Sequence, residues 1–154
     1  MAKSHADFDA TMRMLIDVLQ AKARTLTQVL TITENQENML LSDEMGEEMA
    51  SLWRGINQEK QTLIREVQQA DTTFQNLFAL FGDDFEVYAE AHKEELSALQ
   101  EWVRRVMDLD VKIRVQEKRN RTLTGKPHKG TKKEVTEASR RYITRQYAQN
   151  KDKK

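Results

Sequence analysis

The sequence predicts an all-α fold: an elongated antiparallel up-down-up three-helix bundle, followed by a basic C-terminal tail that is partly disordered or helical. Apolar side chains recur at alternating steps of four and three, the spacing that places them on one face of an α-helix. The 154 residues include only five glycines and one proline, so few positions interrupt a helix. We therefore expect the bundle to occupy residues 1–124 and the tail residues 125–154.

The first helix is expected over residues 7–41. Ser4 or Asp7 supplies its N-terminal cap, because either side chain can accept hydrogen bonds from the free N–H groups of the first turn. The inward stripe turns polar at Thr33 and Glu37, which predicts looser or hydrated packing there. This stripe consists of Phe8, Met12, Leu15, Leu19, Ala23, Leu26, Leu30, Thr33, Glu37 and Leu40.

The second helix is expected over residues 45–81 and carries a long apolar stripe, with Glu59 or Lys60 and Ala70 or Asp71 at the two positions where the series would otherwise lapse. Asp43 is its expected N-cap, and the acidic residues that follow favour a helix N-terminus through its dipole. Gly82 is its expected C-terminal stop, since glycine readily adopts the left-handed conformation there. The stripe consists of Met45, Met49, Leu52, Ile56, Leu63, Val67, Phe74, Leu77 and Phe81.

The third helix is expected to run without interruption from Asp83 to Thr124, before Gly125 and Pro127. Its apolar stripe contains Phe85, Tyr88, Ala91, Leu99, Trp102, Val106, Leu109, Ile113, Asn120 and Leu123. Short connections make consecutive helices antiparallel neighbours.

The short first connection also predicts which residues face one another. A fold at residues 42–43 pairs Phe8 with Leu77 and Thr33 with Leu52. A register shifted by seven residues would match nearly as well, so the corner decides the pairing.

Composition restricts the class of protein. The chain has no cysteine, which excludes disulfides and thiolate metal sites and fits a reducing compartment. No apolar run approaches the roughly 20 residues of a membrane span. Residues 1–8 lack the apolar core of a signal peptide, so we expect a soluble cytoplasmic protein without membrane insertion.

The net charge of zero conceals two oppositely charged parts. Residues 1–103 contain 8 basic and 19 acidic residues, whereas residues 104–154 contain 17 basic and 6 acidic ones. Three interpretations of the basic tail remain open: a segment that binds another protein, a solvated polar tail, or a nucleic-acid contact. We favour protein binding over the solvated tail, and both over nucleic acid, because the tail lacks the stacked aromatic residues that grip single strands.

No catalytic or metal-binding set stands out. His5, His92 and His128 are scattered along the sequence, and the acidic residues beside His92 suit a solvated helix face better than a ligand set. No phosphate-binding glycine loop or nucleophile elbow occurs. We therefore expect no enzyme, no cofactor and no metal.

Three large side chains lie off the predicted stripes and are candidates for exposed contacts. Met14 and Met39 are free to contribute to a contact surface. Trp53 is one position off its stripe, and two alternatives stay open: an exposed interface residue, or one covered by a wide seam between three helices.

Three segments resemble flagellar export chaperones of the FlgN type and, less closely, of the FliT type. They are LTQVLTITENQENML at residues 26–40, SDE at residues 42–44 and EKQTLI at residues 59–64. In that group a first helix turns at an aspartate, and the next carries a Glu-Lys-x-x-Leu signature. Trp53 and Gly55 depart from the family pattern by interrupting the second helix.

The resemblance implies a cytoplasmic, non-enzymatic chaperone. Such proteins bind the helical C-terminal part of hook–filament junction proteins, or of the filament cap, and deliver them to the type III export gate. From the amphipathic pattern of the tail, and not from the family, we expect cargo contacts at Val135, Ala138, Tyr142, Ile143 and Tyr147. The alternatives are a structural or adaptor coiled-coil protein that self-associates as a homo-oligomer, and a nucleic-acid-associated factor with a basic tail.

Overall fold

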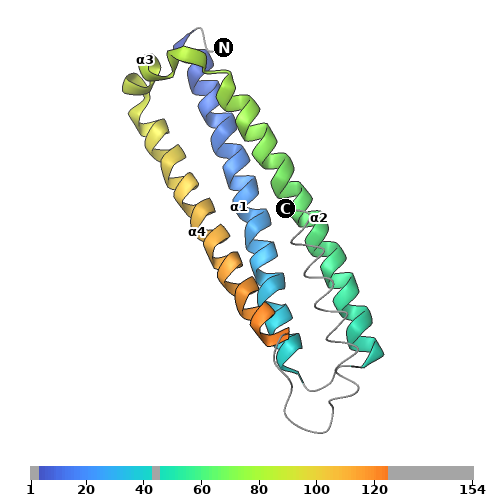
Figure 1. Cartoon of the computed structure of the whole chain (residues 1–154). Coiled ribbons are helices and arrows are strands. Elements are labelled where there is room, and N and C mark those ends of the chain that lie inside the picture. Colours follow the sequence, from blue (N-terminus) through green and yellow to red (C-terminus); the bar gives the residue numbers. More distant parts are fainter. Residues whose placement is uncertain (1–3, 43–45, 125–154) are drawn as a thin grey trace. The chain divides into compact units, whose positions relative to one another are not determined.

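The computed structural model describes residues 4–42 and 46–124, and these residues are almost entirely helical (Figure 1). The elements are α1 (His5–Leu41), α2 (Glu47–Ala79), α3 (Phe85–Ala89) and α4 (Lys93–Thr124), with 3₁₀ turns at Gly82–Asp84 and Glu90–His92. No strand occurs in this part of the chain, which confirms the all-α prediction. None of the described helices combines the length and apolar character needed to cross a bilayer.

The described residues divide into two compact units. Unit 1 contains residues 4–27 and 64–110, and unit 2 contains residues 28–42, 46–63 and 111–124. Each unit therefore draws on α1, α2 and α4, and each has its own interior.

An aromatic cluster forms the interior at one end of unit 1. Phe8 of α1 is fully buried, with its ring centroid 4.8 Å from that of Phe81, 5.9 Å from Phe85 and 5.6 Å from Tyr88. Aromatic pairs at such centroid distances are favourable beyond the apolar area that they bury. Further along α1, Lys22 forms an ion pair with Asp71 of α2.

Helix α1 starts where the sequence predicts a cap. The Asp7 backbone N–H donates to Ser4 Oγ at 3.1 Å, so Ser4 is the cap and Asp7 lies inside the first turn. The predicted stripe is correct from Phe8 to Leu26, where its residues are buried. The expected N-cap of α2, Asp43, lies outside the described residues.

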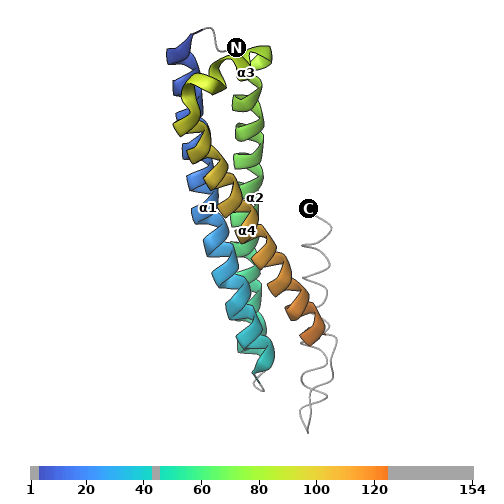
Figure 2. The ribbon, with the colours of Figure 1, turned by 90° about the vertical axis from the view of Figure 1, so that its left-hand side faces the viewer.

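The chain between α2 and α4 differs from the prediction of one uninterrupted helix. Gly82 has a φ of 59°, the left-handed conformation that ends a helix, as expected. The short helix α3 and two 3₁₀ turns then precede α4 (Figure 2). A 3₁₀ turn has about three residues per turn instead of 3.6, so it changes which side chains face inward. In this arrangement the aromatic rings of α3 pack on Phe8. The prediction of a continuous helix from Asp83 is therefore wrong.

A buried polar layer forms the interior of unit 2. Lys60 of α2 is fully buried, and its Nζ lies 2.8 Å from Glu117 Oε1 of α4 and donates to Gln36 Oε1 of α1 at 3.1 Å. Gln36 Nε2 in turn donates to Asn57 Oδ1 at 2.8 Å. These bonds join all three helices of the unit in a hydrogen-bond network, in the region where the sequence predicts looser or hydrated packing.

The polar layer continues between α1 and α4. Asn120 Nδ2 donates to the Thr33 carbonyl oxygen at 2.9 Å, and both residues are fully buried. Gln116 Nε2 donates to Glu37 Oε1 at 2.8 Å. Each amide therefore has a partner that offsets the cost of removing it from water.

In this unit the predicted stripe of α2 is wrong because the helix is rotated, whereas Thr33 and Leu40 of α1 and Ile113 and Asn120 of α4 are buried as predicted. Trp53, Asn57 and Lys60 are the buried residues of α2, whereas Leu52 is 55% exposed. On α1, Val29 and Gln36 are buried in place of the predicted Leu30 and Glu37. A step of one residue is a rotation of about 100° on a helix.

The predicted residue pairing is also wrong. Phe8 packs on Phe81, four residues beyond the predicted Leu77, and Gln36 bonds to Asn57 and Lys60. Helix α2 begins at Glu47, two residues later than predicted, and the pairs Lys22–Asp71 and Gln36–Lys60 show that its register against α1 differs from the predicted one.

Replacing Phe8 by alanine should lower the free energy of unfolding by about 3–5 kcal/mol, because it removes the ring on which the aromatic cluster of unit 1 packs. Urea denaturation followed by far-UV circular dichroism measures this loss. The control is Val87→Ala, which truncates a side chain that is 70% exposed and should change stability little. Equal effects of the two substitutions would contradict the described core.

Replacing Glu117 by glutamine should lower the free energy of unfolding by at least about 2 kcal/mol, because the Lys60 ammonium then stays buried without this counter-charge. The same denaturation experiment measures it. Glu101→Gln is the control, since Glu101 pairs with Arg104 and Arg105 at the surface, and the change should stay within about 0.5 kcal/mol. The double variant Lys60→Met, Glu117→Leu should recover most of the lost stability. If Glu117→Gln destabilised the protein no more than Glu101→Gln does, the buried ion pair would be contradicted.

Candidate functional site

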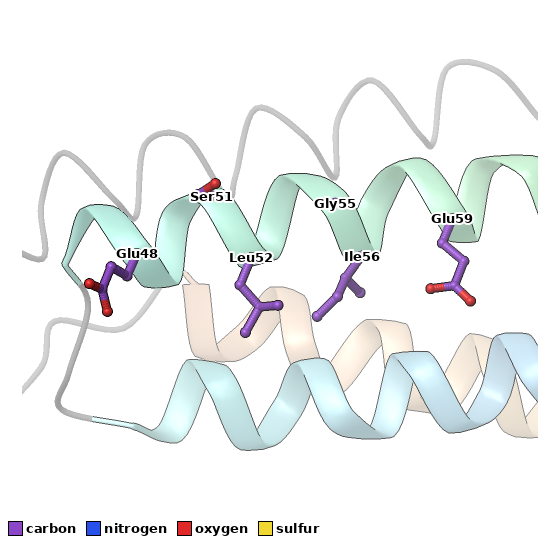
Figure 3. Close-up of a pocket in the computed structure, with 6 residues that line it drawn as sticks. All are labelled: Glu48, Ser51, Leu52, Gly55, Ile56 and Glu59. Carbon is purple, nitrogen blue, oxygen red and sulfur yellow. The ribbon is translucent and has the colours of Figure 1, made fainter.

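One face of α2 in unit 2 is apolar, open and not filled by the described residues. Leu52 and Ile56 project from this face beside a depression of about 580 Å³ (Figure 3). Its lining residues, all on α2, are Glu48, Ser51, Leu52, Gly55, Ile56 and Glu59. We call this surface the α2 face.

The spacing of the lining residues places them on one open face along the helix. They recur at steps of three and four from Glu48 to Glu59, which covers about 16 Å of helix. Leu52 and Ile56 supply its apolar side chains, and Ser51 and Gly55 supply small ones. The α2 face is therefore an open strip, about three helical turns long, against which another helix could pack.

Gly55 allows an especially close approach. Among the described residues, no atom lies within 4 Å of where a Cβ of residue 55 would stand. No described neighbour thus requires glycine here, although glycine costs roughly 1 kcal/mol relative to alanine inside a helix. A small residue in a helix face is useful where a partner backbone packs against it.

The electrostatic character of the α2 face is acidic. Glu48 and Glu59 are exposed and stand at its two ends, and Glu47 and Glu48 lie in the first turn of α2. At the helix N-terminus these carboxylates are favoured by the dipole. An occupant of the α2 face should therefore have an apolar stripe with basic residues around it.

The residues that the sequence predicts as contacts differ in how exposed they are in the structure. Met14 is 43% exposed, as expected, and lies in unit 1. Met39 is half-buried against the cluster of Leu40 and Trp53. The expected cargo contacts Val135, Ala138, Tyr142, Ile143 and Tyr147 lie outside the described residues.

Trp53 is not an exposed contact. It is fully buried, packed with Leu40 of α1 and near Leu123 of α4. Of the two alternatives for this residue, the structure selects the covered one. The reason is the rotation of α2, which turns Trp53 inward together with Lys60.

Sequence reasoning missed two features. It placed Leu52 and Ile56 in the core, although Trp53, Asn57 and Lys60 form an equally regular inward set at steps of four and three. It also treated the histidines as scattered, whereas His5 Nδ1 lies 3.0 Å from His92 Nε2. The signal for the latter was an acidic residue one helical turn after each histidine, Asp9 and Glu95.

The chain matches no known protein-family model, no curated protein and no solved structure.

The burial of Trp53 predicts a distinctive fluorescence. The chain has two tryptophans, so Trp102→Phe leaves only Trp53, whose emission should be blue-shifted and little quenched by iodide. The reverse variant, Trp53→Phe, leaves Trp102, which is half-buried with the Arg105 guanidinium 4.7 Å from its ring, and should be quenched more. Stronger quenching of Trp53 than of Trp102 would show that the described rotation of α2 is not adopted in solution.

Proposed function

We propose that this protein binds an amphipathic helix of another polypeptide on the α2 face. More narrowly, we propose a cytoplasmic flagellar export chaperone whose cargo is the helical C-terminal part of a hook–filament junction protein or of the filament cap. Delivery of that cargo to the type III export gate belongs to the same proposal, as does the absence of enzymatic activity.

The observation that carries the proposal is the exposure of Leu52 beside Gly55. An apolar residue that is 55% exposed, next to a small residue and between two carboxylates, suits a surface on which a helix packs. In helix-in-groove recognition the bound helix supplies apolar anchors at steps of three and four, and Leu52 and Ile56 would receive such anchors on the α2 face. Basic residues flanking the apolar stripe of the cargo helix would pair with Glu48 and Glu59.

The proposal includes the up-down-up arrangement of a three-helix bundle. Within unit 1, Phe8 packs on Phe81 and Lys22 forms an ion pair with Asp71. Residue numbers that increase along α1 are therefore paired with residue numbers that decrease along α2 and the turn that follows it. This order supports antiparallel packing of α1 and α2. A cargo helix would then add a further helix to an existing bundle.

The basic tail completes the proposal. We place Val135, Ala138, Tyr142, Ile143 and Tyr147 in contact with the cargo helix, as their amphipathic pattern suggests. Ordering of cargo and chaperone segments on association would appear as a gain of helix.

The test uses a synthetic peptide of the C-terminal helix of a hook–filament junction protein from the same genome. Isothermal titration calorimetry should show binding, and circular dichroism should show a gain of helix. Leu52→Lys should weaken binding by about tenfold or more, because it places a charge where an apolar anchor is expected. Val111→Lys is the matched control, since Val111 is also 55% exposed in unit 2 but lies on α4.

A second pair of variants separates binding from stability. Gly55→Ala should raise helix stability by roughly 0.5–1 kcal/mol. Even so, Gly55→Ala should lower the affinity for the peptide, and Gly55→Leu should lower it more strongly. Deletion of residues 131–154 should abolish the gain of helix.

Binding that survives Leu52→Lys and Gly55→Leu contradicts the α2 face as the binding site. Absence of peptide binding by the whole chain contradicts the proposed chaperone function. A stable oligomer without ligand would favour the self-associating adaptor protein. Binding of nucleic acid whose affinity falls steeply with salt would favour the nucleic-acid-associated factor.

A further inference from the structure

Two histidines and two carboxylates converge in unit 1. His5 and Asp9 belong to the first turns of α1, His92 ends the 3₁₀ turn Glu90–His92, and Glu95 lies at the start of α4. One ligand atom from each of Asp9, His92 and Glu95 lies within 4.8 Å of the other two. Asp9 lies at least 83 positions before His92 and Glu95 in the sequence, so the tertiary fold brings the three residues together.

Local helix geometry aims each pair at the same place. His5 and Asp9 are four residues apart, and His92 and Glu95 are three apart. Residues at these spacings lie on one helix face, one above the other. The cluster therefore consists of two adjacent pairs from facing segments.

The charges of the cluster call for a cation. The Asp9 and Glu95 carboxylates repel each other at this separation. Arg13 lies 2.9 Å from Asp9 Oδ2, but 75% of its side chain is exposed, so water and salt weaken this pair. Glu95 Oε2 is 3.9 Å from His92 Nδ1. A divalent ion between the three groups would neutralise both carboxylates at once.

Aromatic rings limit the movement of His92. The Phe8 ring lies 5.0 Å from that of His92, and Tyr88 packs edge-on against His5 at 4.8 Å. Only 14% of the His92 side chain is exposed. The imidazole is thus held in one orientation before any ion arrives, which reduces the entropy lost on binding.

His5 has a different task from the other three residues. Its Nδ1 lies 3.0 Å from His92 Nε2, so one of the two nitrogens donates a hydrogen bond to the other. His92 Nδ1, on the side of Glu95, is then the nitrogen left to meet an ion. Histidine ligands are commonly oriented in this way through their second nitrogen.

We propose that Asp9, His92 and Glu95 bind a divalent transition-metal ion of the zinc class, with His5 as the positioning residue of His92. An imidazole among the ligands selects zinc-class ions over Mg²⁺ and Ca²⁺, which prefer oxygen ligands alone. Three protein ligands leave a coordination position for water. The ion would join the start of α1 to the start of α4 within unit 1. This proposal does not depend on the proposed function.

The test is a calorimetric titration of the full-length, tag-free protein with Zn²⁺, with Mg²⁺ titrated in parallel. A single Zn²⁺ should bind per chain, and Mg²⁺ should not compete. His92→Ala should lower the Zn²⁺ affinity by about 100-fold or more, and His5→Ala by about tenfold, as expected for a ligand and for a residue that orients it. Asp9→Asn and Glu95→Gln should also weaken binding.

Two controls and a second readout complete the experiment. Glu94→Gln and His128→Ala should leave the Zn²⁺ affinity unchanged, since Glu94 is exposed outside the cluster and His128 lies in the tail. Zn²⁺ should raise the thermal midpoint of the natural chain but not that of His92→Ala, because binding to the folded state alone stabilises it. Equal Zn²⁺ affinity in the natural chain and in His92→Ala, or no saturable binding, would overturn the proposal.

Discussion

Burial of the Lys60 ammonium is the constraint on which the structure of unit 2 depends. A charge removed from water costs several kcal/mol unless it is paired and hydrogen-bonded. Glu117 on α4 and Gln36 on α1 satisfy this requirement, and both can do so only while Lys60 points between their helices. The rotation of α2 follows from this position. It carries Trp53 inward, and it turns Leu52 towards solvent.

The α2 face is therefore a consequence of the polar layer. With Trp53, Asn57 and Lys60 turned inward, Leu52 and Ile56 are left on the α2 face. A polar layer of this kind specifies register at some cost in stability, as buried polar residues do in coiled coils. Here it has a second effect, because it leaves an apolar stripe unused beside Gly55. The same side chains that define the packing of unit 2 thus create a surface suited to another helix.

Unit 1 is organised by different chemistry. Phe8 is the residue around which Phe81, Phe85 and Tyr88 pack, so aromatic contacts replace the polar network. The 3₁₀ turns on either side of α3 allow these rings to face α1. The same turns bring His92 beside the first turn of α1. A packing requirement therefore assembles the histidine and carboxylate cluster, which has no counterpart along the sequence.

The sequence by itself determined the all-α class, the stop at Gly82 and the inward stripe of α1 from Phe8 to Leu26, because caps and apolar periodicity act over a few residues. It did not determine which face of α2 is buried. Two stripes one residue apart, one through Leu52 and one through Trp53, are both regular, and only partners from α1 and α4 distinguish them. The approach of His5 to His92 was likewise decided by the tertiary structure, since no local pattern relates residues 87 positions apart.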